Sequence, residues 1–192
     1  AEATIWNLGN EVFMLALTVL IVDSRQDGPL MLGLIFMAGG LGAFLGAGIS
    51  ARLTERFGYG RSLVTAMLVG NTAPLVGVLF SSDTSVKSLV VLSAAFFASG
   101  FGTGVANSQA VTVRQVTVPE NLRGRVNASY RMLSWGALAI GALLGGWLIS
   151  AVGGWLAAAL GTAAMAASTL PVALSPVRQM RDLEDDAPPT VG

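Results

Sequence analysis

The sequence of 192 residues contains no cysteine and no histidine. Such a chain cannot form a disulfide, hold a metal ion with thiolate or imidazole ligands, or carry a cysteine nucleophile or a Ser–His dyad. Charge is also scarce, because Asp, Glu, Lys and Arg together make up 11% of the residues. The aspartates are not grouped for catalysis, since all of them lie outside the long apolar stretches. We therefore expect no enzymatic activity, no metal, no cofactor and no nucleic-acid partner.

The chain instead consists largely of apolar stretches without a charged residue. Hydrophobic residues make up 53% of the chain, and the mean hydropathy is +0.68. The longest uncharged stretch, residues 132–177, has 46 residues, and the others are residues 28–51, 62–82 and 88–113. About 20 apolar residues in a helix cross a bilayer core. The longest stretch therefore predicts two spans, each of the others predicts one, and residues 3–22 supply a sixth.

The predicted fold is thus an all-α membrane protein whose six transmembrane helices occupy residues 1–177. The spans are expected at about residues 3–22, 30–51, 62–81, 88–113, 126–150 and 153–175. Residues 178–192 are rich in charge and proline, which predicts a short disordered tail. Because the sequence opens on Ala1 without a basic leader, we expect it to be a piece of a longer protein.

Arginine is distributed unevenly between the predicted connections. Lys and Arg in short loops stay on the cytoplasmic side during insertion. If the chain begins inside, the external connections hold only Arg25 and Lys87, and nine arginines lie in the cytoplasmic connections and the tail. These nine are Arg52, Arg56, Arg61, Arg114, Arg123, Arg125, Arg131, Arg178 and Arg181. The asymmetry predicts a multi-pass protein of the inner (plasma) membrane with both ends in the cytoplasm.

The connection after the second span, residues 51–61, reads Ala-Arg-Leu-Thr-Glu-Arg-Phe-Gly-Tyr-Gly-Arg. Here the chain resembles the major facilitator superfamily of secondary transporters, whose hallmark loop is Gly-x-Leu-x-Asp-Arg-x-Gly-x-x-Arg. The positions that match are Leu53, Arg56, Gly58 and Arg61, whereas Glu55 replaces the aspartate and Ala51 the leading glycine. Charge bias alone would supply arginines in any cytoplasmic loop, but it does not explain the spacing of the acid and the glycines.

The connection after the fourth span contains Val-Pro-Glu-x-x-Arg-Gly-Arg-Val at residues 118–126. This phrase is similar to the same loop in superfamily exporters of the enterobactin and macrolide type. Thr117 and Glu120 also form a capping-box pattern, which predicts a short surface helix before the fifth span. The two departures in the first loop are those that the C-terminal copy of that loop commonly shows. The resemblance therefore implies half of the major facilitator fold, helices seven to twelve, with a missing N-terminal six-helix half as its partner.

Polar residues within the spans are candidates for the path of substrate and protons. Glu11 is the one acid well inside a predicted span, which makes it a candidate to carry a proton or to attract a cationic solute. Asn7 lies one turn before it on the same face and Asn10 is adjacent. An equal alternative is that the span begins near Glu11, with the acid at the interface. Further candidates are Asn71, Asn107 and Arg131, although Arg131 can instead extend to the headgroups.

Two further groups carry structural predictions. We expect Glu55 to pair with an arginine of the later loop and so to latch one state of the transport cycle. The predicted latch comprises Glu55, Arg56, Gly58, Arg61, Arg123 and Arg125. Small residues four apart allow close helix packing in lipid, and Gly141, Gly145 and Gly146 show this spacing in the fifth span. They also resemble an antiporter signature with Ala142 in place of proline, but packing is the preferred interpretation.

The resemblance implies half of a secondary transporter that binds small-molecule substrates and protons among membrane lipid. The leading hypothesis is export of small amphipathic molecules, drugs or siderophores, by proton antiport with alternating access. An importer or facilitator of the same fold is the alternative within transport. A non-transporting six-helix assembly or regulatory partner is the alternative outside it.

Overall fold

A computed structural model describes residues 2–24, 27–81 and 85–179. Six long helices dominate it, followed by a short helix α7 (Leu170–Ala173) and a 3₁₀ turn η1 (Pro176–Gln179). The long helices are α1 (Glu2–Ser24), α2 (Gly28–Phe57), α3 (Tyr59–Phe80), α4 (Val86–Thr117), α5 (Glu120–Val152) and α6 (Gly154–Ser168). Six segments are long and apolar enough to cross a membrane, the last running from Gly154 to Ala173. The predicted all-α class with six membrane-length helices is confirmed.

Two helix ends differ from the sequence-based expectation. The predicted surface helix before the fifth span does not exist, because α5 runs unbroken from Glu120 to Val152. The capping box was also wrong, since Thr117 is the last residue of α4 and Pro119 is the N-cap of α5. The fixed φ of Pro119 starts the helix directly, and its carbonyl oxygen accepts hydrogen bonds from the amides of Leu122 and Arg123. Residues 178 and 179 belong to η1, and the rest of the expected tail lies outside the described residues.

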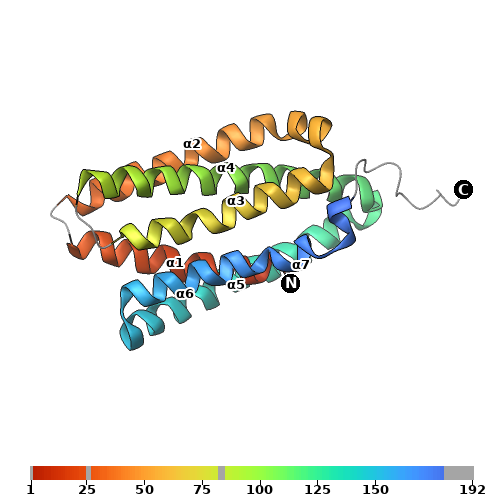
Figure 1. Cartoon of the computed structure of the whole chain (residues 1–192). Coiled ribbons are helices and arrows are strands. Elements are labelled where there is room, and N and C mark those ends of the chain that lie inside the picture. Colours follow the sequence, from red (N-terminus) through yellow and green to blue (C-terminus); the bar gives the residue numbers. More distant parts are fainter. Residues whose placement is uncertain (1, 25–26, 82–84, 180–192) are drawn as a thin grey trace, which may run out of the picture.

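The six helices alternate in direction along one axis (Figure 1). The connections α2–α3 and α4–α5 lie at the same end of the bundle as the first residues of α1 and the turn η1. We call this the arginine end, because the arginines of both predicted cytoplasmic connections lie there. The last turns of α1 and α3, the first turns of α2 and α4, and the α5–α6 connection lie at the opposite end (Figure 1). An even number of crossings is thus built into the arrangement.

Two glycines make the tight reversals between consecutive helices. Gly58 (φ 82°) separates α2 from α3, and Gly153 (φ 86°) separates α5 from α6. A residue with a Cβ is strained at such a positive φ, so glycine is required at both positions. The Gly58 amide donates to the Thr54 carbonyl at 2.8 Å, and the Gly153 amide donates to the Ile149 carbonyl at 3.0 Å. The glycine of the hallmark loop therefore has a conformational reason.

The packing of the helices has internal symmetry. Helix α4 packs mainly on α2 and α3, α1 packs mainly on α5 and α6, and α3 contacts α6. If α1, α2 and α3 are exchanged for α4, α5 and α6, the contacts of α4 with α2 and α3 become the contacts of α1 with α5 and α6. The contact between α3 and α6 is unchanged by the exchange. Gly58 and Gly153 exchange as well, although they lie at opposite ends of the bundle. The chain thus consists of two inverted three-helix repeats.

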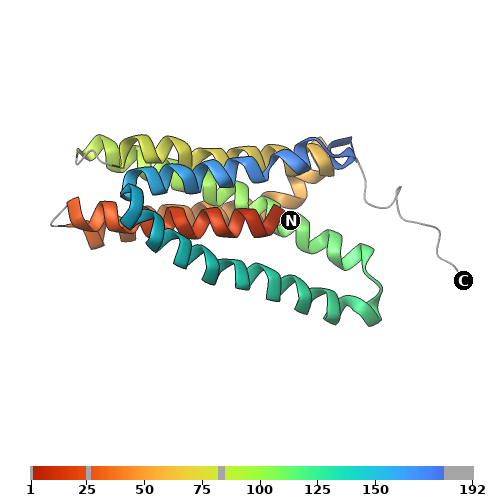
Figure 2. The same cartoon turned by 90° about the horizontal axis from the view of Figure 1, so that it is seen from below.

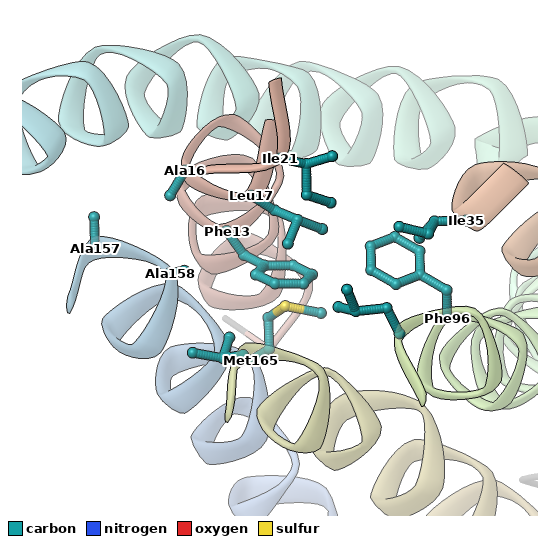
Figure 3. Packing of buried hydrophobic residues seen from close by; sticks show 11 residues of the cluster. Phe13, Ala16, Leu17, Ile21, Ile35, Phe96, Ala157, Ala158 and Met165 are labelled. Carbon is teal, nitrogen blue, oxygen red and sulfur yellow. The ribbon is translucent and has the colours of Figure 1, made fainter. Parts of the chain in front are cut away.

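The apolar core fills the end of the bundle opposite the arginine end. Figure 3 shows Phe13 of α1 between Met165 of α6 and Phe96 of α4. The ring centroids of Phe13 and Phe96 are 5.7 Å apart, and Leu17 and Ile35 extend the cluster. These side chains come from α1, α2, α4 and α6, so the core joins both repeats. It closes one half of the bundle and leaves the other half for a cavity.

Candidate transport cavity

A cavity of about 350 Å³ lies in the half of the bundle nearer the arginine end. Its walls come from the first turns of α1 and α3, the second half of α4, the first half of α5 and α7. Both repeats therefore contribute. This transport cavity, as we name it, is where the polar residues predicted from the sequence can be compared with the structure.

Three of the predicted residues, Asn7, Asn71 and Asn107, line the transport cavity from three different helices. Asn71 is 4% exposed and is held on both sides of its amide. The Trp6 Nε1 donates to Asn71 Oδ1 at 2.8 Å, and Asn71 Nδ2 donates to Thr169 Oγ1 at 2.8 Å. Asn71 thus ties α1 and the break between α6 and α7 to α3. Asn107, in contrast, is exposed.

Aromatic and apolar side chains form most of the remaining wall. Trp6, Met67, Tyr130 and Trp135 are large side chains in this wall, and Ser134 adds a hydroxyl. Trp6, Met67 and Trp135 were not sequence-based candidates. The signal was present for α1, since Trp6 lies one residue before Asn7 at the start of the same helix. In α5 the signal was the polar Tyr130 and Ser134 within the predicted span, but which residues of this helix face the cavity depends on how the helix is rotated.

Three other predicted residues do not line the cavity. Glu11 is half-buried at the contact between α1 and α5, where a Cβ added to Gly141 would lie 2.8 Å from the Glu11 Cβ. Asn10 is half-buried on the same helix. Arg131 is exposed, and its guanidinium carbon lies 4.7 Å from the centroid of the Trp135 ring, which does line the cavity. The acid that lines the cavity is Glu2, which the sequence did not single out.

The residues of the predicted latch all lie at the arginine end, and five of them are charged and exposed. Glu55 forms no ion pair with Arg123 or Arg125 in this structure. The Arg123 Nε donates instead to the Val118 carbonyl at 2.9 Å, and the Arg56 guanidinium carbon lies 5.5 Å from the centroid of the Phe57 ring. The latch therefore stays a prediction.

The predicted packing glycines of α5 fall into two groups. A Cβ on Gly141 would meet Glu11 and the Leu8 backbone, and a Cβ on Gly145 would meet Val12 of α1 at 3.2 Å. Gly141 and Gly145 therefore set the distance between α1 and α5. Gly146 is exposed, and no described atom lies within 4 Å of the Cβ position there, so it packs on none of the described helices.

A second polar group lies between α2, α3 and α4 near the arginine end. Gln109 is 3% exposed, and its Nε2 donates to Thr54 Oγ1 and to Ser62 Oγ, each at 2.8 Å. Its Oε1 is buried without a hydrogen-bond partner among the described residues. Hydrogen bonds between helices in lipid contribute about 0.6 kcal/mol on average. Gln109 thus joins three helices through one amide.

The cavity offers amides, hydroxyls and the Glu2 carboxyl group for contact with a solute. Within residues 2–24, 27–81 and 85–179, no three Asp or Glu side chains gather in a way that could hold a metal ion. The described helices form two inverted three-helix repeats, and the cavity between them is lined by apolar residues and a few polar ones. This arrangement is that of a multi-pass membrane protein with half of a secondary-transporter fold.

The comparison with protein families agrees with this class. The profile of the Major Facilitator Superfamily matches residues 5–187, so the chain belongs to this family, whose members are transporters. The chain is also 32% identical over 112 residues to the arabinose-proton symporter of Bacillus subtilis (strain 168). That match covers 58% of this chain and 23% of the symporter, so the chain spans well under half of this relative's length.

Proposed function

We propose that this chain is the C-terminal half of a transporter that exports small amphipathic molecules by alternating access, driven by proton antiport. The observation that carries the proposal is the lining of the transport cavity, in which aromatic and apolar side chains surround a few separated amides and hydroxyls. Such a wall suits a solute with a large apolar surface and few polar groups. Drugs and siderophores of this kind are the proposed substrates.

The state of the amides supports this choice. Asn71 already bonds to Trp6 and Thr169, which leaves Asn7 and Asn107 as the cavity amides for a ligand. A polyhydroxylated solute buried against this wall would leave several hydroxyl groups without partners, at about 1 to 3 kcal/mol for each. An amphipathic solute avoids that cost, because its apolar surface contacts Met67 and Trp135.

The position of the cavity supports alternating access. The core closes one half of the bundle, and the cavity lies in the other half, near the arginine end. Positive-inside bias favours a cytoplasmic arginine end, which would put both chain ends in the cytoplasm and the protein in the plasma membrane. The proposed N-terminal half would cover the cavity from the other side and complete the transporter, as helices one to six.

Proton coupling is proposed through two acids in the first half of α1, Glu2 and Glu11. Glu2 lines the cavity, and Glu11 lies about 13 Å farther along the helix, by the 1.5 Å rise per residue. A carboxyl facing a cavity is the usual proton carrier in a membrane helix. Glu2→Gln and Glu11→Gln separate the two acids, because the coupling acid is the one whose loss abolishes proton-driven transport while substrate still binds.

The direct test is efflux of a panel of amphipathic dyes from cells that make the complete transporter. We expect efflux that a protonophore abolishes and that Asn107→Leu slows through a raised KM. Gly33→Ala is the matched control, because open space surrounds the Cβ position there. Efflux that persists with a protonophore contradicts antiport, and an unchanged KM in Asn107→Leu contradicts the assignment of the cavity.

The second candidate function is proton-coupled uptake, and the likeness to a proton symporter favours it. The two directions give opposite results in proteoliposomes that are acidic outside. A symporter accumulates solute inside these vesicles, whereas an antiporter moves it outward against the proton flow. Radiolabelled arabinose and one dye from the efflux panel, measured side by side, decide between them.

A further inference from the structure

A second hollow, of about 360 Å³, lies between α2 and α3 with Phe101 of α4 in its wall. It shares no lining residue with the transport cavity. The hollow exists because α2 and α3 each pack closely on α4 but touch each other little. We call it the α2–α3 groove.

The groove is apolar and faces outward. Its wall includes Leu53, Ala66 and Phe101, and Phe57 and Val69 are 51% and 42% exposed. Both α2 and α3 are membrane-length apolar helices, so hydrocarbon surrounds this part of the bundle. Its exposed apolar side chains are therefore suited to a lipid chain rather than to water.

The residues of α3 that line the groove indicate how deep the groove lies in the membrane. The groove runs along this helix from Arg61, at the arginine end, to Val69. Eight residues at 1.5 Å each give a length of about 12 Å. The groove therefore starts at the headgroup layer and continues into the hydrocarbon, which matches the shape of a phospholipid and not that of a compact water-soluble ligand.

The charge at the mouth selects the headgroup. Arg61 is the one charged residue in the described lining, and it forms no ion pair with another described residue. A second guanidinium, that of Arg56, lies 5.5 Å from the centroid of the Phe57 ring that borders the groove. Guanidinium groups bind phosphate through paired hydrogen bonds, and arginines on the cytoplasmic side attract anionic lipids.

We infer that the α2–α3 groove binds one anionic phospholipid of the cytoplasmic leaflet. The phosphate pairs with Arg61, and an acyl chain lies against Phe57 and Val69. The site does not depend on which compound the protein carries. A lipid held here bridges α2 and α3 across the gap where the two helices make little direct contact.

The test measures lipids bound to the complete transporter by native mass spectrometry, after delipidation and titration with phosphatidylglycerol or phosphatidylcholine. We expect the unmodified protein to retain phosphatidylglycerol preferentially. Arg61→Ala should lower this retention about fivefold, which corresponds to about 1 kcal/mol for one arginine near the membrane surface. Arg61→Lys should restore part of it.

Two further variants separate the site from general attraction to the membrane. Thr65→Trp places a large ring in the groove from an exposed position, so it should displace both lipids. Arg52→Ala removes the same charge from an exposed position of α2 outside the groove lining and should leave retention unchanged. Equal losses in Arg52→Ala and Arg61→Ala, undiminished retention in Thr65→Trp, or no preference for phosphatidylglycerol would each overturn the inference.

Discussion

Helices α1 and α4 occupy equivalent places in the two repeats, and half of their contacts are alike. Gly9 meets Gly161 where α1 packs on α6, and Gly70 meets Gly102 where α3 packs on α4. Each pair brings backbone against backbone, which is the closest approach that helices make in lipid. These two equivalent interfaces therefore have the same construction.

The other half of the contacts differs. Where α4 packs on α2, glycines lie on both helices, since a Cβ on Gly42 or Gly46 would overlap α4 and a Cβ on Gly100 or Gly104 would overlap α2. Where α1 packs on α5, the glycines lie on α5 alone and meet both side-chain and backbone atoms of α1. Residues 120–133 of α5 are exposed throughout, and Figure 2 shows this end of α5 diverging from α1. One wall of the cavity is thus closely packed, and the other has space to move.

The largest effect is expected on the α2–α4 interface. In Gly42→Ala the new Cβ would lie 2.9 Å from the Phe97 carbonyl carbon, and backbone cannot move aside. Overpacking of this kind costs about 3 kcal/mol at the upper end of its usual range, so the melting temperature in detergent should fall sharply. The matched control is Gly40→Ala, where no described atom lies within 4 Å. Equal melting temperatures for the two variants would contradict the assigned contact.

The next largest loss of stability is expected where α1 is joined to α3 by hydrogen bonds. These bonds are made by side chains, and Asn71→Ala removes the partner of both Trp6 and Thr169. Leaving the buried Thr169 hydroxyl and the half-buried Trp6 indole N–H without this partner should cost about 1 to 2 kcal/mol. Thermal unfolding measures it, and Asn107→Ala serves as the amide control because Asn107 is exposed. A loss in Asn107→Ala as large as that in Asn71→Ala would argue against the tether.

A smaller effect is expected on the α1–α5 interface. In Gly141→Ala the new Cβ meets the Glu11 Cβ and the Leu8 backbone, but α5 can shift away from them because its first half is exposed. A loss of about 1 kcal/mol follows, at the low end of the overpacking range. Gly146→Ala, which faces open space, should stay within about 0.5 kcal/mol of the original protein. If Gly141→Ala destabilised as much as Gly42→Ala, the two walls would be equally rigid and the comparison would fail.

The smallest effect on stability is expected at the arginine end. Glu55→Gln should leave the melting temperature unchanged, because Glu55 pairs with neither Arg123 nor Arg125 here and surface pairs contribute under about 1 kcal/mol. Efflux by the complete transporter should nevertheless slow, if the latch forms in another state of the cycle. Asp27→Asn, an exposed acid at the opposite end, is the control. Unchanged efflux in Glu55→Gln would remove the latch.

The sequence was most informative where one residue or one stretch suffices. Uncharged stretches predicted five of the six membrane-length helices, and the apolar residues on both sides of Glu11 predicted the sixth. The hallmark loop placed Gly58 at a reversal that needs a positive φ. The sequence was least informative about helix faces. Hydropathy marked Glu11 as an acid within a span but could not show that it contacts α5 while Glu2 lines the cavity.

The hydrogen bonds of Asn71 show why contacts between helices could not be predicted from the sequence. Trp6, Asn71 and Thr169 are far apart along the chain. Asn71 was a sequence-based candidate as a polar residue within a span, but nothing in the sequence paired it with the other two. Only the rotation of α1 and α3 about their axes, together with the break of α6 before Pro171, brings the three groups within hydrogen-bond distance. That rotation is set by packing between helices, which no single span encodes.

Local composition was thus enough to specify how many helices cross the membrane and where they reverse, because a lipid-facing helix must be apolar and long whatever its neighbours are. The pairing of the two repeats, the closed core at one end and the cavity at the other were decided by tertiary packing. Glycine contacts such as Gly9 with Gly161 acquire their meaning only when two backbones meet.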